Sequence, residues 1–365
     1  MSFPSSPATD LMNAAMPAST AFPGRLSVAP MLDWTDRHCR YFHRLLSKRA
    51  LLYTEMVTTG ALLHGDVGRH LRFNEEEHPV ALQLGGSEPA DLAAAARLGE
   101  QWGYDEINLN CGCPSERVQR GAFGACLMAE PQLVADGVKA MRDAVGLPVT
   151  VKHRIGIDKT ESYEFVRDFV GVVSEAGCHS FIVHARNAWL QGLSPKENRE
   201  IPSLRYELVH QLKSDFPHLY FSLNGGVRDG EQVKAQLALV DGVMVGREAY
   251  HNPWWLTSWD AEFFGDGQAA GNPSDAQTRE DVEAQMVAYM EREAERHGTP
   301  WSAIARHMLG LRHGLPGARR WRQVWSDHRN KALAPRDVMA LAHAHDRAAD
   351  VADDLALSPG LAAAG

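Results

Sequence analysis

Eight short apolar runs recur along the first two thirds of the chain. They occupy residues 27–30, 51–57, 79–84, 106–110, 149–153, 180–184, 219–224 and 241–245. Runs that are apolar at nearly every position are typical of strands buried on both faces, and such strands form parallel sheets. Amphipathic segments of helical length lie between most of them, at 36–47, 88–102, 131–145, 162–175, 204–215 and 230–239. Eight strands that alternate with helices over about 230 residues predict an α/β protein, a (β/α)8 TIM barrel.

A different pattern begins after the last strand. Residues 266–277 contain Gly, Asn and Pro and predict a linker, so the barrel is expected at 25–265. The pattern then becomes helical, at 279–297, 300–310 and 335–353. It predicts a smaller all-helical domain at 278–353. Residues 1–24 contain no Lys or Arg, so we expect a disordered leader there rather than a signal peptide, and residues 354–365 are expected to form a disordered tail.

Composition narrows the class of protein. A hydrophobic content of 44% and a charged content of 23% are ordinary for a globular protein, and the longest apolar runs are far too short to cross a membrane. The five cysteines are scattered at 39, 111, 113, 126 and 178. This spread argues against a disulfide framework and favours a reducing, cytoplasmic location. Cys111 and Cys113 could bind zinc, but no second cysteine pair completes a tetrahedral site, so we expect no structural metal.

Charge is distributed unevenly. The formal net charge of −9 disfavours a nucleic-acid partner when taken alone. Residues 296–331, however, contain eight Lys or Arg and one acid, Asp327, which is a local charge of +7. Local charge decides docking. With Trp301, Trp321 and Trp325, this stretch either binds an RNA backbone and stacks on bases, or is a solvated helical face whose tryptophans form the core of the small domain.

Polar or reactive residues end the predicted strands. The residues that end or closely follow a strand are Met31, Glu55, Gln83, Asn110, Lys152, His184, Asn224 and Gly246. Because a barrel builds its active site at the carboxyl ends of its strands, we expect a catalytic centre at this rim. The pair Gly225 and Gly226, and the pair Gly246 and Arg247, follow the last two strands, where barrels often bind phosphate. Ordinary turns are the alternative interpretation of these glycines.

Two basic residues are expected to face this site. Lys152 and His153 alternate along one strand, and we expect Lys152 to point inward and His153 to pack outside. A lysine at the rim could bind an anionic ring edge, bind a phosphate or form a Schiff base. His184 shares a strand face with Arg186. It is either a buried core histidine or a functional one, and its place at the rim favours a function.

The segment Asn110-Cys111-Gly112-Cys113-Pro114 follows the fourth predicted strand. A residue before proline is biased away from the helical conformation, so Cys113 is expected at the mouth of the barrel. A thiolate there would act as a nucleophile, whereas a protonated thiol would act as a general acid. A thiol of ordinary pKa, about 8.5, is mostly protonated at neutral pH, but the residues alone leave both roles open. Gly121 and Gly124 would let the segment move as a lid, or they mark an ordinary turn.

Many collinear segments between about residue 25 and about residue 345 carry a resemblance to a known family. They are SVAPMLDWTD at 27–36, YTEM at 53–56, ALQLG at 81–85, NCGCP at 110–114, VK at 151–152, HAR at 184–186, GLSPKENRE at 192–200, NGG at 224–226, GR at 246–247, RHM at 306–308 and GAR at 317–319. In these segments the chain resembles the tRNA-dihydrouridine synthases, and specifically their A subfamily. The resemblance implies a barrel that carries FMN, joined to a helical domain that binds tRNA.

The same resemblance implies a reaction. The family reduces the C5–C6 double bond of selected uridines in tRNA, here D-loop uridines around position 20/20a, with NADPH as the reductant. Reduced FMN is implied to deliver hydride to C6, and Cys113 is implied to donate the proton to C5. This assignment favours the protonated thiol. A uracil inside a folded tRNA must first be extruded to reach the barrel rim.

Residue by residue, the resemblance implies two sets of contacts. FMN is expected against Ala29, Pro30, Met31, Gln83, Asn110, Lys152, His184, Asn224, Gly225, Gly226, Gly246 and Arg247. The tRNA is expected against Arg120, Arg186, Lys196, Arg199, Arg319 and Arg322. We expect a monomer. Two other functions stay open: a flavin barrel that reduces a small molecule, which leaves the basic stretch without a use, and a non-catalytic RNA-binding protein, which leaves Cys113 and the glycine loops unexplained.

Overall fold

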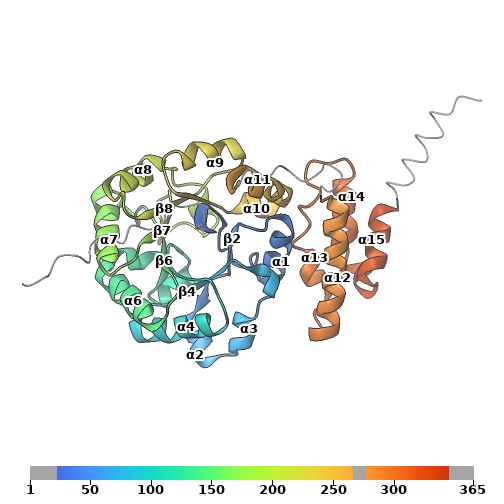
Figure 1. The fold of residues 1–365 in the computed structure, drawn as a ribbon, viewed down its shortest axis with the longest axis horizontal. Coiled ribbons are helices and arrows are strands. Elements are labelled where there is room, and N and C mark those ends of the chain that lie inside the picture. The colour runs from blue at the N-terminus through green and yellow to red at the C-terminus, as the bar shows by residue number, and fades with distance from the viewer. Residues whose placement is uncertain (1–22, 266–276, 345–365) are drawn as a thin grey trace, which may run out of the picture.

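The computed structural model describes residues 23–265 and 277–344 (Figure 1). The predicted leader (1–24), the linker (266–277) and the tail (354–365) lie outside the described residues, apart from 23, 24 and 277. The last part of the helix predicted at 335–353 also lies outside them.

A closed ring of parallel strands forms the larger part of the molecule. The strands are β1 (Leu26–Val28), β2 (Leu51–Tyr53), β3 (Val57–Thr58), β4 (Val80–Gly85), β5 (Glu106–Cys111), β6 (Val149–Arg154), β7 (Ser180–His184), β8 (Tyr220–Asn224) and β9 (Gly242–Val245). Each strand from β4 to β9 pairs with the next one along the chain. The ring closes because β1 pairs with both β9 and β2, while β2 also pairs with β4. The predicted TIM barrel is therefore confirmed.

One predicted strand is broken into two. The apolar run at 51–57 forms β2 and β3, separated by residues 54–56. The Thr54 side chain explains the break, because its Oγ1 accepts a hydrogen bond from the backbone N–H of Gln83 at 3.0 Å and donates one to the carbonyl of Glu55 at 2.7 Å. A side chain that bonds nearby backbone in this way competes with the strand ladder. β2 and β3 together occupy the position of one of the eight strands of the barrel.

Helices surround the strands (Figure 1). Six of them match the predicted segments to within two residues: α1 (Arg37–Leu46), α4 (Pro89–Gln101), α6 (Pro131–Ala144), α7 (Tyr163–Glu175), α8 (Tyr206–Asp215) and α9 (Gly230–Leu237). Five short helices were not predicted: α2 (Thr59–His64), α3 (Val67–Leu71), α5 (Glu116–Arg120), α10 (Arg247–His251) and α11 (Trp259–Phe263). Such helices span too few turns to produce a clear periodic signal.

The apolar core has two parts. The larger part fills the space between strands and helices, and it includes Leu52, Val80 and Val243. A second, separate cluster consists of Ala29, Leu51, Tyr53, Ala81, Ile182 and Met244, with Met31 packed against it. Neighbouring residues along each strand belong to the outer core, so alternation places this second cluster inside the barrel. Met31 therefore caps the interior from the rim side.

The C-terminal helical region contains α12 (Arg279–His297), α13 (Trp301–Ala305), α14 (Ala318–Ser326) and α15 (Pro335–His343). The helix α12 begins and ends where it was predicted, whereas the segment predicted as a helix at 300–310 is helical only over α13, and α14 was missed. Short 3-10 helices also occur in the described part of the chain, at Pro23–Arg25, Glu75–Glu77, Gly124–Ala129, Glu197–Arg199, Pro253–Ser258 and His328–Ala332.

A buried carboxylate organises this helical region. Glu283 on α12 is fully buried and accepts hydrogen bonds from Trp321 Nε1 at 2.8 Å and Trp325 Nε1 at 2.9 Å. Its other oxygen lies 2.8 Å from Nε2 of His343. Trp301 is buried too, and its Nε1 donates to the carbonyl of Leu333. The three tryptophans are thus core residues, as one of the two interpretations of the basic stretch expected, and none of them offers a free face for a base.

The helical region is fastened to the barrel at the start of α1. Asp36 caps that helix and also binds Arg306 at 2.8 Å and His307 at 3.0 Å. Burial by itself would raise the pKa of Asp36, but the hydrogen bond and charge of His307 hold it well below its usual range. His38 lies 2.7 Å from the hydroxyl of Tyr289 on α12. Because α1 starts at the rim, these contacts place the helical region beside the carboxyl ends of the strands.

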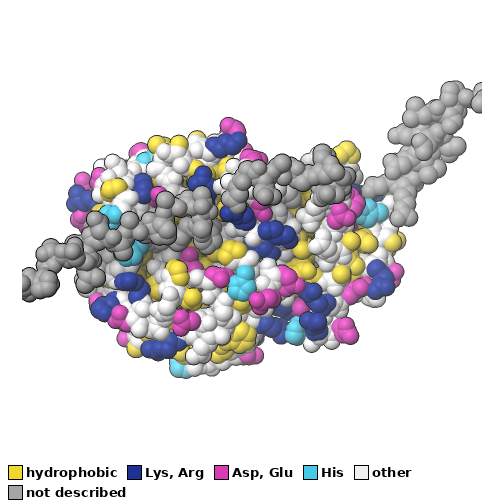
Figure 2. Space-filling model, viewed as in Figure 1, with side chains coloured by type: hydrophobic (Ala, Val, Ile, Leu, Met, Phe, Trp, Pro, Cys, Tyr) yellow, Lys and Arg dark blue, Asp and Glu magenta, His cyan; other side chains and the backbone are white. Residues whose placement is uncertain are grey.

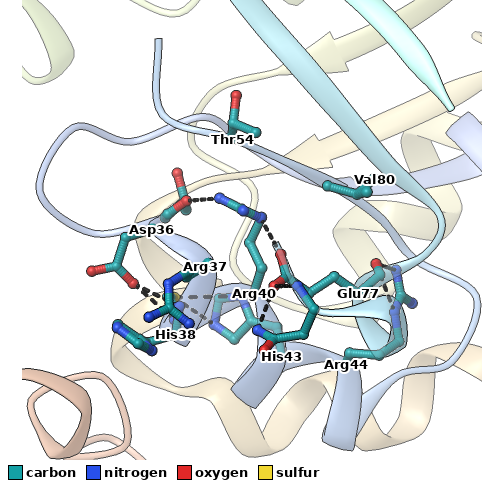
Figure 3. A network of polar contacts seen from close by, with 12 residues as sticks. Asp36, Arg37, His38, Arg40, His43, Arg44, Thr54, Glu77 and Val80 are labelled. Carbon is teal, nitrogen blue, oxygen red and sulfur yellow. Dashed lines mark hydrogen bonds and ion pairs between the residues drawn. The ribbon is translucent and has the colours of Figure 1, made fainter. Parts of the chain in front are cut away.

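Two arginines of the same helix bind the segment that precedes β4 (Figure 3). Arg40 donates to Oε2 of Glu77 at 2.7 Å and to the carbonyl of Thr35 at 2.8 Å. Arg44 donates to the carbonyls of Glu77 and Pro79, both at 3.0 Å. These buried, charge-assisted bonds hold α1 against the segment that leads into β4, and they fix the position of the helix that carries Asp36.

Buried histidines make the fold sensitive to acid. Burial is the first cause that lowers the pKa of His38 to about 4, of His43 to about 3 and of His153 to about 4. An unfolded histidine titrates near 6.5, so between pH 6.5 and about 4 the unfolded chain binds protons that the folded chain does not. We expect stability to fall across this window, by up to about 1.4 kcal/mol per pH unit for each histidine.

Thermal unfolding measured from pH 7.5 down to pH 5 tests this expectation. His153→Leu should flatten the fall in melting temperature, because it removes one of the histidines whose pKa burial lowers. His328→Asn is the matched control, since the His328 side chain is 85% exposed and should not affect the slope. An unchanged slope in His153→Leu would show that this histidine is not neutral in the folded protein.

Candidate active site

Polar side chains line up across the rim in strand register. Asn110 at the end of β5 is opposite Lys152 on β6, and His184 at the end of β7 is opposite Asn224 at the end of β8. Nδ2 of Asn224 donates to the carbonyl of Met244 on β9 at 2.8 Å. Gln83 on β4 accepts from Nδ2 of Asn110 at 2.8 Å. The structure therefore brings these five predicted cofactor residues to one edge of the barrel.

The loop after β5 presents Cys113. Oδ1 of Asn110 accepts hydrogen bonds from the backbone N–H groups of Gly112 at 3.1 Å and Cys113 at 2.9 Å. The carbonyl of Cys113 accepts from Ala125 N at 2.9 Å. Gly124 has φ +78°, and a Cβ there would lie 2.6 Å from the Cys113 carbonyl oxygen, so this close approach requires glycine. Gly124 thus packs the loop tightly, which favours the turn over the lid.

The two cysteines of the NCGCP segment have different environments. Cys113 is half-buried, and its Sγ lies 3.5 Å from Oγ of Ser115. Cys111 is fully buried in the outer core, and burial raises the pKa of its thiol. Cys113 is the thiol that the loop makes accessible, whereas Cys111 is a packing residue.

A cavity of about 760 Å³ adjoins the Cys113 loop. One wall is formed by residues 114–116 and 119, and the other by residues 190–195 of the loop after β7. Gln119 joins the two walls, because its Nε2 donates to the carbonyl of Pro114 at 2.6 Å and to that of Leu190 at 2.7 Å. The lining includes neither Cys113 nor any of the predicted FMN contacts, so this pocket lies beside the polar rim rather than within it.

Arg154 and Asn198 support both walls, and sequence reasoning missed them. Arg154 Nε donates to the carbonyl of Gly112 at 3.0 Å, and its Nη1 donates to the carbonyls of Asn187 and Asn198. Asn198 is fully buried and bonds the backbone of Trp189 in both directions, at 2.7 and 2.9 Å. Arg154 lies two residues after Lys152 at the end of one strand, which is the pattern that could have revealed it.

Burial tunes the basic groups at the rim. Burial, followed by the charge of Arg154, lowers the pKa of Lys152 to about 7. Burial and the charges of Arg154 and Lys152 hold the pKa of His184 well below its usual range, so this imidazole is neutral. Neutral His184 can donate from one nitrogen and accept at the other. His153 points away from this site, between Phe169 and Phe181, as predicted.

The glycines after β8 form a cradle. Gly225 has φ +119° and Gly226 has φ +74°, and an added Cβ would lie 2.8 Å from the His184 ring or 2.5 Å from Leu204. Both positions therefore require glycine for close packing, and bare glycine backbone at the end of a strand is the kind of site that binds a phosphate. Gly246 precedes α10 beside the same strands.

Arg247, predicted to bind FMN, and Arg186, predicted to bind tRNA, both form bonds with other groups of the protein. Arg247 forms an ion pair with Glu200 at 2.6 Å, so a phosphate at this position would compete with that carboxylate. Arg186 donates to the carbonyls of Glu200 and Pro202, which makes it a brace for the loop after β7.

The other predicted tRNA residues lie on two elements. Lys196 and Arg199 are exposed on the loop after β7, and Arg319 and Arg322 are exposed on α14. The side chain of Arg120 lies outside the described side chains. On the face shown in Figure 2, Lys and Arg side chains mix with acidic ones over the barrel and gather in several places around the junction with the helical region.

Residues 23–265 and 277–344 contain neither a cluster of metal-binding side chains nor a helix long and apolar enough to cross a membrane. In this part of the chain no three His, Cys, Asp or Glu side chains come together as a metal site. Every helix described there is too short or too polar to traverse a bilayer.

The fold has a distant solved counterpart. A 2-naphthoyl-CoA reductase in complex with 2-naphthoyl-CoA superimposes with a TM-score of 0.51 at 13% sequence identity, over 65% of this chain and 50% of that one. An identity this low supports the shared fold alone.

Sequence comparison is more specific. The chain is 60% identical over 340 residues to a tRNA-dihydrouridine(20/20a) synthase of Escherichia coli (strain K12), covering 92% of this chain and 96% of that protein. It is 59% identical over 316 residues to the synthase of the same name from Vibrio parahaemolyticus, covering 86% and 94%. A model of the dihydrouridine synthase family matches residues 27–348. With this match across nearly all of the barrel and the helical region, the chain belongs to the dihydrouridine synthase family.

Proposed function

We propose that this protein reduces uridines in the D-loop of tRNA, around positions 20 and 20a, to 5,6-dihydrouridine, with FMN as cofactor and NADPH as reductant. The observation that carries the proposal is Cys113, presented on a tight loop beside a polar rim and a large cavity. Relatives that are about 60% identical bear the name of this activity. In this proposal residues 25–265 are the catalytic domain and residues 278–353 the tRNA-binding domain.

Residues of the rim would hold the cofactor. The Gly225–Gly226 cradle would hold the phosphate, while Gln83, Asn110, Lys152 and His184 would bind the ring edge and ribityl chain. When bound, FMN supplies the two-electron reduction at C6 of the uracil. Met31 and the apolar cluster beneath it would support the ring system.

Cys113 performs the proton transfer. It holds a proton on Sγ and donates it to C5 of the uracil, which leaves a thiolate that is reprotonated from solvent. Arg154, Lys152 and Arg199 lie within electrostatic reach of this sulfur, and the charge of the two arginines, with that of Lys152 when it is protonated, stabilises the thiolate that forms. The uridine must leave the tRNA stack to reach this rim, while exposed arginines on α14 bind the backbone.

Purification and a tRNA assay test the function. The purified protein should show flavin absorbance and, with NADPH, should form dihydrouridine at D-loop positions of a tRNA, detected by mass spectrometry. Protein that takes up no FMN would contradict the proposal. Equal rates on free uridine and on tRNA would favour the small-molecule reductase, and tRNA binding without reduction would favour the non-catalytic RNA-binding protein.

Gly226→Ala should weaken FMN binding about tenfold or more, because alanine is strained at φ +74° and its Cβ would lie 2.5 Å from Leu204. Titration of flavin-free protein with FMN, followed by quenching of flavin fluorescence, measures the change. Gly60→Ala is the matched control, since Gly60 has open space around it. Equal affinity in both variants would remove the glycine cradle from the cofactor site.

A further inference from the structure

A continuous chain of hydrogen bonds runs through the inside of the barrel and ends at the Cys113 loop. We propose that this chain, anchored by the carboxyl group of Glu106, positions Cys113 for proton transfer. Glu106, Thr150 and Asn108 are then positioning residues of the enzyme. The inference rests on the proposed function, because it assumes that Cys113 is the proton donor.

The upper links join the catalytic loop to β4 and β5. The backbone N–H of Cys113 donates to Oδ1 of Asn110 at 2.9 Å. Nδ2 of Asn110 then donates to Oε1 of Gln83 at 2.8 Å. Nε2 of Gln83 donates to Oδ1 of Asn108 at 2.7 Å. Each amide in this part of the chain accepts on one side and donates on the other.

The lower links cross to β6 and return to β5. Nδ2 of Asn108 donates to Oγ1 of Thr150 at 2.8 Å, and Oγ1 of Thr150 donates to Oε1 of Glu106 at 2.5 Å. The hydroxyl of Tyr53 donates to the same oxygen at 2.7 Å. The links that join Cys113 to Glu106 therefore all point the same way, from the loop down to the carboxyl group.

Burial makes the direction of the chain important. Asn108 is 0% exposed, Gln83 and Thr150 are 1% exposed and Glu106 is 5% exposed, so water cannot replace a lost partner at low cost. Amides and hydroxyls can each both donate and accept, and a chain made only of them could run in either direction. An acceptor at one end selects one direction, and the bonds reinforce one another.

Glu106 is that acceptor. Burial raises the pKa of its carboxyl group to about 7. Beside it lies a polar cavity of about 10 Å³ whose lining includes Ser27, Ser180 and Ser222, close to the room that one water needs. A proton on the oxygen that does not bind Thr150 leaves Oε1 free to accept both bonds. The direction of the chain is thus preserved whether Glu106 is charged or neutral.

A reversed chain would disturb Cys113. If the amide of Asn110 turned, its Nδ2 would face the N–H groups of Gly112 and Cys113, and three donors would meet without an acceptor. The loop would have to move to relieve this contact. The geometry at the rim therefore depends on a carboxyl group at the far end of the chain.

The test breaks one link far from the rim. Thr150→Val keeps the shape of the side chain but removes Oγ1, so we expect reduction of tRNA by the pre-reduced enzyme to slow about tenfold or more. FMN content and the rate of flavin reduction by NADPH should stay within about twofold, because the glycine pair, Lys152 and His184 lie outside the chain of hydrogen bonds and would still hold the cofactor. Thr150→Ser, which restores the hydroxyl, should recover most of the rate. Glu106→Leu should behave like Thr150→Val, and Glu106→Gln, which keeps an acceptor oxygen, like Thr150→Ser.

A second readout does not depend on catalysis. The rate at which iodoacetamide alkylates Cys113 in flavin-free protein, followed on the Cys113 peptide by mass spectrometry, should change about threefold or more in Thr150→Val. Ser222→Ala is the control, because it removes a buried hydroxyl of the barrel interior that has no hydrogen-bond partner among the described residues.

The outcomes separate this inference from the proposed function. Wild-type alkylation and tRNA reduction rates in Thr150→Val would overturn the positioning role, as would an equal change in Ser222→Ala or loss of FMN in step with activity. A protein that forms no dihydrouridine would contradict the proposed function, while the alkylation rates would still report whether the chain positions Cys113.

Discussion

Cys113→Ala should lower the rate of dihydrouridine formation about 10²- to 10⁴-fold, the range typical of a lost general acid. FMN content should not change, because the side chain is not part of the glycine cradle. Single-turnover reduction of tRNA by the pre-reduced enzyme measures the effect without interference from NADPH. Cys126→Ser is the matched control: Cys126 is also half-buried, and its Sγ bonds the carbonyl of Phe123.

The pH dependence distinguishes the two roles of the thiol. A general acid must keep its proton, so the wild-type rate should fall as the pH is raised into the alkaline range. A nucleophile would show the opposite trend, since the thiolate is then the reactive form. A rate that rises with pH, or near-normal turnover by Cys113→Ala, would remove Cys113 as the proton donor.

The double variant Arg319→Ala with Arg322→Ala should weaken tRNA binding about tenfold at moderate salt and reduce the slope of log Kd against log salt by about 2. Both arginines are exposed on α14, whereas Trp321 and Trp325 on the same helix are buried against Glu283. Binding through α14 is therefore expected to be electrostatic, with no contribution from stacking on these rings. Titration of labelled tRNA at several salt concentrations measures both quantities.

Arg329→Ala is the matched control for this surface. The Arg329 side chain is 80% exposed, but its guanidinium binds both carboxylate oxygens of Asp327. Removing it should change tRNA affinity much less than the double variant does. If the double variant keeps the salt slope of the wild type, the basic stretch is a solvated surface and the tRNA binds elsewhere.

Local patterns predicted much of the fold because helix caps and apolar periodicity depend only on residues that are close in sequence. The helix α12 was placed at its observed ends since it starts at a capping box between Thr278 and Asp281 and stops at Gly298 in a left-handed conformation. The break between β2 and β3 was missed because it depends on a bond between Thr54 and Gln83, which are far apart in sequence. The helix α14 was missed because its arginines and tryptophans were interpreted as possible RNA contacts, and that interpretation does not define where a helix begins or ends.

The candidate site likewise has residues that sequence motifs identified and contacts that only the structure shows. Sequence motifs pointed to Cys113, Lys152, His184 and the glycine pair, since residue types at strand ends carry that information. They could not reveal that Arg186 and Arg247 are engaged with the segment around Glu200. Nor could they find Arg154 as a brace, because its three carbonyl partners come from three separate loop positions.

The amino-acid sequence by itself determined the barrel, the chemistry available at its rim and the family. Apolar periodicity and the identity of strand-end residues are local properties, and no tertiary contact is needed to interpret them. Only the tertiary structure decided which side chains are partners. Strand register brings Asn110, Gln83, Asn108, Thr150 and Glu106 into one directed chain of hydrogen bonds. This chain exists because β4, β5 and β6 lie side by side in the closed barrel. A hydrogen bond depends on distance in space, and the chain order alone does not contain that distance.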